Sequence, residues 1–114
     1  MNQDTAETCT TPGLIDLQVN GFAGVDFNTP GLTAGDLDHA LQAMAGTGVA
    51  ACLPTLITAP AEDLADCFTN LERAARGSRR AATMVPGYHL EGPFLSPLEG
   101  YRGCHPAAAM GAAD

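Results

Sequence analysis

Hydrophobic and polar positions along this chain predict strands that alternate with helices. Residues 14–20 (Leu-Ile-Asp-Leu-Gln-Val-Asn) alternate apolar and polar side chains, as a half-buried strand does. Residues 49–57 form a nearly continuous apolar run, which is typical of a strand buried on both faces, although Pro54 cannot donate to a ladder. Residues 83–91 predict a third strand, which Gly92-Pro93 ends.

The segments between these strands have the period of amphipathic helices. Thr33 is a suitable N-cap, with Asp36 three residues on, and apolar residues recur at helical spacing up to Gly46. A second helix can begin at Pro60, and its first turn is acidic. This order predicts an α/β fold with about three parallel strands and two crossover helices.

The two ends of this pattern differ. Residues 1–11 are polar and without period, so they predict a disordered N-terminal tail. Residues 12–114 carry all the predicted elements and form a single unit, in which 21–31 are rich in turn-forming residues and predict a loop.

Composition narrows the classes of partner and the compartment. The 114 residues carry a net charge of −8 with five basic residues, all arginine, which argues against nucleic acid and anionic membranes as partners. No apolar stretch is long enough to span a bilayer, and the start has no signal-peptide pattern, so we expect a cytoplasmic protein. Four cysteines without a Cys-x-x-Cys pair are then expected to be free thiols.

Four of the arginines gather at the end of the second predicted helix, at positions 73, 76, 79 and 80. A helix dipole favours cations there, so a solvated helix end explains them, and phosphate binding is the alternative. His39, within the first helix, is expected to face solvent.

Polar residues at strand ends are the candidates for chemistry, because active sites of parallel α/β folds lie at the carboxyl edge of the sheet. His89 and Glu91 are two residues apart and share one face of the third strand. A carboxylate at this edge needs a cation or several donors, so Glu91 is a candidate metal ligand. Its spacing fits equally well a glutamate paired with arginine or exposed in a loop.

Other polar residues are expected near Glu91. Gln18 and Asn20 share a face at the end of the first strand, where amides can bind substrate or water, or merely reflect strand-end polarity. His105 and Arg102 lie in the loop after the third strand, and an imidazole and a cation near a bound metal suit a sugar or oxyanion. A solvated loop arginine explains Arg102 as well.

Three segments together resemble signatures of the N-acetylglucosamine-6-phosphate deacetylase family, in the family's order. They are residues 12–21 (Pro-Gly-Leu-Ile-Asp-Leu-Gln-Val-Asn-Gly), 53–58 (Leu-Pro-Thr-Leu-Ile-Thr) and 89–96 (His-Leu-Glu-Gly-Pro-Phe-Leu-Ser). The family belongs to the amidohydrolases, which are metal-dependent TIM-barrel hydrolases. The resemblance covers about residues 12–106 and implies that the chain is the N-terminal portion of a (β/α)8 barrel.

The resemblance also implies a chemistry. Gln18 and Asn20 stand where many amidohydrolases have a His-x-His pair, which implies a single divalent metal ion, Zn²⁺ or Fe²⁺, with Glu91 as a ligand. Cys104 and His105 match a Gly-Ala-His-like sequence that contacts the amino sugar, with Cys104 in place of a small residue. The implied reaction converts N-acetylglucosamine 6-phosphate to glucosamine 6-phosphate and acetate, in an enzyme expected to be a homodimer at full length.

The resemblance predicts an incomplete site. A barrel takes roughly 250 residues, whereas this chain has 114. The family's two histidine ligands and its acid/base aspartate are expected outside the chain, so no catalytic residue is assigned within it. We expect residues 1–114 to be a fragment that is inactive alone. The alternatives are a non-catalytic half-barrel remnant, a split-enzyme segment that needs a partner chain, or an amidohydrolase for another N-acyl sugar or a cyclic amide.

Overall fold

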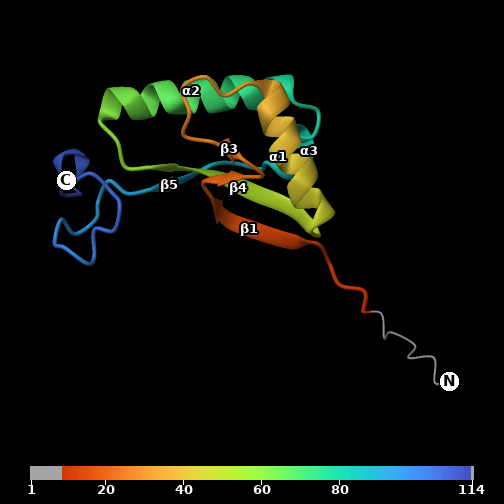
Figure 1. Ribbon diagram of the computed structural model, residues 1–114, viewed down its shortest axis with the longest axis horizontal. Coiled ribbons are helices and arrows are strands. Elements are labelled where there is room, and N and C mark those ends of the chain that lie inside the picture. Colours follow the sequence, from red (N-terminus) through yellow and green to blue (C-terminus); the bar gives the residue numbers. More distant parts are fainter. Residues whose placement is uncertain (1–8, 114) are drawn as a thin grey trace.

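A three-stranded parallel sheet forms the framework of the molecule. The computed structural model describes residues 9–113, in which β1 (Leu14–Val19), β4 (Val49–Ile57) and β5 (His89–Glu91) pair in the order β1-β4-β5. Helices α1 (Ala34–Gly46) and α2 (Ala61–Gly77) lie on one side of this sheet (Figure 1). Strand order follows chain order, as in a barrel, and does not reverse as in a doubly wound sheet. The predicted α/β class is confirmed, and the sheet is consistent with part of a barrel.

The predicted tail lies mostly outside the described residues. Residues 1–8 are not described, and Cys9–Thr11 are exposed and belong to no helix or strand.

Helix α1 begins where its capping residues predict. The Thr33 hydroxyl accepts a hydrogen bond from the Asp36 N–H (3.1 Å), and an Asp36 carboxylate oxygen accepts from the Thr33 N–H (3.1 Å). These two bonds form a capping box, which satisfies donors that the first turn leaves free.

The predicted third strand is wrong in its first half. Ala81–Met84 form a short helix, α3, and only His89–Glu91 pair with β4. The Ser78 hydroxyl accepts a hydrogen bond from the Ala81 N–H (3.0 Å), and Ala81 and Met84, three residues apart, are both buried. The sequence of this stretch is compatible with either helix or strand, and the burial of residues at helical spacing stabilises the helix.

The predicted loop at 21–31 contains a small hairpin. Strands β2 (Gly21–Phe22) and β3 (Val25–Asp26) pair antiparallel. Gly21 is required where β2 begins opposite Asp26, because a Cβ there would clash with the Val25 carbonyl oxygen. Near the end of the chain, η1 (Ala107–Ala109) is a single 3-10 turn.

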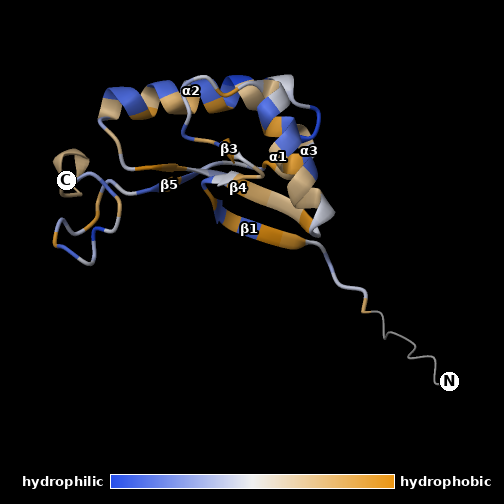
Figure 2. Cartoon of the chain, viewed as in Figure 1, coloured by the Kyte–Doolittle hydropathy of each residue, from blue (hydrophilic) through white to orange (hydrophobic). Residues whose placement is uncertain are grey.

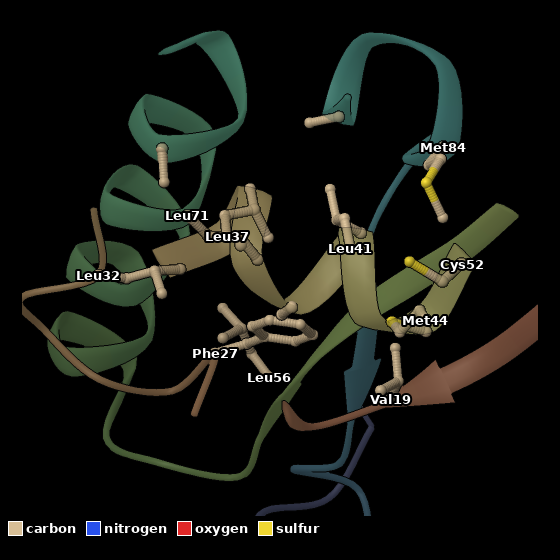
Figure 3. Close-up of a cluster of buried hydrophobic side chains, with 13 residues drawn as sticks. Val19, Phe27, Leu32, Leu37, Leu41, Met44, Cys52, Leu56, Leu71 and Met84 are labelled. Carbon is tan, nitrogen blue, oxygen red and sulfur yellow. The ribbon is translucent and has the colours of Figure 1, made fainter. Parts of the chain in front are cut away.

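The core lies between the helices and the sheet, and the helices turn their apolar sides toward it (Figure 2). Leu37 and Leu41 of α1 face Phe27 and Leu56 (Figure 3), and all four are at most 1% exposed. Leu71 is the α2 residue that is completely buried there.

Two thiols belong to this buried layer. Burial is the main cause that raises the pKa of Cys52 to about 11, and burial also raises the pKa of Cys67. Both groups are therefore protonated and unreactive near neutral pH. All four cysteines, Cys9, Cys52, Cys67 and Cys104, are free thiols, as predicted.

No described helix is long and apolar enough to cross a membrane.

A candidate active site at the carboxyl edge of the sheet

Three side chains meet where β4 and β5 end. Ile57 pairs with Glu91 in register, so Thr58, the first residue after β4, lies beside Glu91. The Thr58 hydroxyl donates to the Glu91 carbonyl oxygen (3.1 Å). His105 returns from the following loop, with Nδ1 2.9 Å from Thr58 Oγ1 and Nε2 3.4 Å from Glu91 Oε1. We call Thr58, Glu91 and His105 the edge cluster.

The hydrogen bonds of the edge cluster orient its imidazole. Thr58 has one hydroxyl proton, which goes to the Glu91 carbonyl, so its oxygen accepts from His105 Nδ1–H. His105 Nε2 then faces the Glu91 carboxylate. The Nε2 lone pair and the Glu91 carboxylate, 3.4 Å apart, can both interact with a positive charge. That charge could be a proton on Nε2 or a metal ion beside the two groups.

Close packing holds the edge cluster together. Thr58 is 2% and His105 7% exposed, whereas the Glu91 side chain keeps 33% exposure. Gly92 permits this approach: its φ is +89°, and a Cβ would fall 1.9 Å from Thr58 Oγ1. The carboxylate is therefore reachable from solvent, while the groups that fix it are buried.

The loop that carries His105 is built by backbone turns. The Leu98 carbonyl accepts from the N–H groups of Tyr101 (3.2 Å) and Arg102 (3.0 Å), and the Arg102 carbonyl accepts from the His105 N–H (3.2 Å). Arg102 thus places His105 through its backbone. Its side chain forms no salt bridge within residues 9–113, and Cys104 is exposed beside His105.

Three other predicted residues form no hydrogen bond with the edge cluster. His89 points to the neighbouring strand, with Nδ1 2.9 Å from the Leu17 carbonyl oxygen. Gln18 and Asn20 are exposed at the end of β1. The structure therefore brings Glu91 and His105 together, and neither of them forms a hydrogen bond or ion pair with Gln18, Asn20 or His89.

Sequence reasoning missed Thr58 and Asn28. The Asn28 side chain donates to the Thr55 carbonyl (3.1 Å) and accepts from the Ile57 N–H (2.9 Å), so it pairs with the end of β4 as a neighbouring strand would. Thr58 could have been found from its place directly after a strand, which is the signal that identified Glu91. Nothing local marks Asn28, because its partners are 27 and 29 residues away.

The edge cluster has side chains that could supply some of the ligands of a metal ion. Glu91 provides a carboxylate and His105 an imidazole, and both are common ligands of zinc and iron. Within residues 9–113 no group of three or more His, Cys, Asp or Glu side chains could hold a metal ion. Further ligands would have to come from outside these residues.

Known proteins give this geometry a context. No protein-family model matches the chain. The N-acetylglucosamine-6-phosphate deacetylase of Caenorhabditis elegans is 37% identical over 100 residues, which cover 84% of this chain and 23% of that protein. A mutant of the deacetylase from Mycobacterium smegmatis, solved in complex with N-acetyl-D-glucosamine-6-phosphate, superposes with a TM-score of 0.72 at 31% identity and covers 90% of this chain and 25% of that chain.

The chain is homologous to part of an N-acetylglucosamine-6-phosphate deacetylase. This confirms the family expected from residues 12–21, 53–58 and 89–96. The chain spans about a quarter of the length of the deacetylases it matches. An N-acetylgalactosamine-6-phosphate deacetylase from Shewanella sp. (strain ANA-3) is also 38% identical over 99 residues, so the match includes deacetylases for two amino sugars.

Proposed function

We propose that this chain supplies part of the active site of a metal-dependent deacetylase for an N-acetylated amino-sugar 6-phosphate. The edge cluster is the observation that carries the proposal: it places a solvent-reachable carboxylate and a buried, oriented imidazole at the carboxyl edge of the sheet. The chain around it is 31% identical to a deacetylase mutant solved with its amino-sugar phosphate. The proposed reaction converts N-acetylglucosamine 6-phosphate to glucosamine 6-phosphate and acetate. N-acetylgalactosamine 6-phosphate is the second candidate substrate, because of the Shewanella relative.

The residues of this chain have separate roles in the proposal. Glu91 would hold one divalent metal ion, Zn²⁺ or Fe²⁺, and the bound ion would supply polarisation of the amide carbonyl and a lowered pKa for a water molecule. His105, held by Thr58 through Nδ1, would accept a hydrogen bond from the sugar's acetamide N–H at Nε2. Cys104, Arg102, Gln18 and Asn20 surround the substrate. The remaining ligands and the acid/base carboxylate come from residues outside this chain.

A chimera tests these roles. The aligned residues of this chain replace the matching quarter of the Mycobacterium smegmatis deacetylase, and turnover of both amino-sugar phosphates is measured. We expect an active chimera in which Glu91→Gln lowers kcat/KM by about 100-fold or more and lowers bound metal, since losing a residue that only orients a metal ligand already costs about 10- to 100-fold. Glu99→Gln is the matched control, because Glu99 is an exposed glutamate of the same loop region.

The outcomes separate the enzyme from its alternative. A folded chimera that is inactive, or one in which Glu91→Gln and Glu99→Gln behave alike, favours a non-catalytic segment that only packs with a partner. The 114-residue chain alone is expected to show no turnover, because its described residues lack a third metal donor. Turnover by the chain alone, abolished by Glu91→Gln, would contradict the shared-site proposal.

A further inference from the structure

Strand β1 contains an extra residue just before its polar end. Asp16 pairs with Cys52 and Val19 with Pro54, so three steps along β1 match two steps along β4. An irregularity of this kind leaves backbone groups without their ladder partners, and these groups need other partners when they lie within a sheet. The bulge includes Leu17 and Gln18, and Asn20 lies two residues after it.

Two side chains supply the missing partners. The Val19 N–H donates to Thr55 Oγ1 (3.0 Å), and the Thr55 hydroxyl in turn donates to the Leu53 carbonyl (2.9 Å). The Leu17 carbonyl lies 2.9 Å from His89 Nδ1. Thr55 and His89 are themselves register partners in β4 and β5. His89 therefore reaches from β5 past the intervening strand to β1.

This contact determines which ring nitrogen carries the proton. A carbonyl oxygen can only accept, so His89 Nδ1 must be the donor. In the neutral ring Nε2 is then an acceptor. A backbone carbonyl that fixes the tautomer of a histidine also fixes the orientation of its ring.

We propose that His89 is a positioning residue that sets the end of β1, with Gln18 and Asn20, relative to Glu91. The cross-strand bond joins the strand that carries the two amides to the strand that carries the carboxylate, two residues before Glu91. The part of this inference that concerns catalysis rests on the proposed deacetylase function; the bond and its tautomer do not.

The first test uses the 114-residue chain and needs no substrate. NMR of ¹⁵N-labelled histidine is expected to show His89 with hydrogen on Nδ1 and a lone pair on Nε2. His89→Leu is expected to shift the amide signals of 17–20 and speed their hydrogen exchange, while His89→Asn, whose amide can donate from a similar position, restores both toward the original. His39→Leu is the matched control, because His39 is an exposed histidine on α1, away from β1 in the sequence. A proton on Nε2 instead, or β1 signals that respond alike to His39→Leu, would overturn the proposal, and the tautomer measurement stands even if a variant fails to fold.

The second test uses the active chimera. His89→Leu is expected to lower kcat/KM about 10- to 100-fold with metal content unchanged, the range typical of residues that orient active-site groups without binding substrate or metal. His89→Asn is expected to recover most of the loss. Loss of metal in proportion to activity, or no recovery with asparagine, would exclude a positioning role. An inactive chimera would refute the proposed function, and the NMR result on the chain would still decide the β1 contact.

Discussion

At the scale of single residues, the edge cluster depends on a close backbone approach at Gly92. Its φ of +89° lies in the left-handed region that glycine adopts readily. The space for a side chain is already filled by Thr58, whose hydroxyl joins Glu91 to His105. Conformation and packing therefore both require glycine at this position.

Gly92→Ala separates these two requirements when it is compared with Gly100→Ala. Gly100 has nearly the same φ, +91°, but open space around its Cβ position. Left-handed backbone at alanine costs about 1–2 kcal/mol, so Gly100→Ala is expected to lose about that much stability. Gly92→Ala adds a clash with Thr58 and is expected to cost roughly 1–3 kcal/mol more, the size of an overpacking penalty. Urea unfolding of both variants measures the difference.

Equal losses in the two variants would show that Thr58 yields easily and that Gly92 acts through backbone conformation alone. In that case the His105 and Glu91 signals would also remain unchanged in NMR spectra of Gly92→Ala.

The placement of single residues could be predicted from sequence where strand geometry was sufficient. Glu91 ends a strand at the carboxyl edge of the sheet, as expected, and the following loop brings His105 back to that edge. The orientation of His105 could not be predicted, since it depends on a threonine 47 residues away. His89 was expected beside Glu91, but the bulge in β1 offers its ring a carbonyl that no sequence pattern reveals.

At the scale of elements, helix α1 is determined by its own residues. The Thr33–Asp36 capping box is local, and the hydrogen bonds from the Thr33 hydroxyl and N–H lower the pKa of Asp36 below its ordinary value of 3.8. A lowered folded-state pKa means that the carboxylate contributes stability above pH 3.8, which is lost as the pH falls through the folded-state pKa.

Thr33→Ala is therefore expected to destabilise the chain in a pH-dependent way. Loss of an N-cap side chain costs about 1 kcal/mol at neutral pH. The difference in stability from the original chain is expected to narrow as the pH falls from 3.8 through the lowered folded-state pKa, because Asp36 then becomes protonated in both proteins and its share of the capping box disappears. Thermal unfolding at pH 7 and pH 3 measures the difference in stability between the original chain and Thr33→Ala. Thr33→Ser, which keeps the hydroxyl, is the control. A gap that stays constant with pH would assign the cap to the hydroxyl alone.

Elements that depend on distant contacts were less predictable. Strand β4 was found because of its apolar run, although only its second half is largely buried. Its Pro54 is accommodated beside the bulge, where it pairs with Val19. Helix α3 was mistaken for strand, since its four residues become helical through Ser78 and burial against the core. The hairpin of β2 and β3 was missed because each strand has two residues, too few for any period.

At the scale of the whole molecule, the helices cover one side of the sheet and leave the edge strand β1 largely exposed. Strand β1 is at an edge, and its Ile15 and Leu17 are 66% and 64% exposed. In a closed barrel this edge would pair with another strand, and the residues beside it would be covered. Exposed apolar side chains on an open edge promote association, although a net charge of −8 opposes self-association.

Self-association of the chain, measured at different salt concentrations and with a charge introduced at the β1 edge, shows which of these two effects is larger. We expect the 114-residue chain to associate more strongly when salt is added. At 0.1 M salt, charges more than about 10 Å apart are largely screened, so repulsion between the chains weakens while the attraction between their apolar edges remains. Leu17→Lys is expected to reduce this association several-fold in sedimentation velocity, because the charge must be desolvated when a strand docks there. Leu98→Lys is the matched control, since Leu98 is also 64% exposed but lies in the loop after β5. If Leu98→Lys were equally effective, general hydrophobicity would drive association, and the open edge of β1 would not be the surface at which the remainder of a barrel docks.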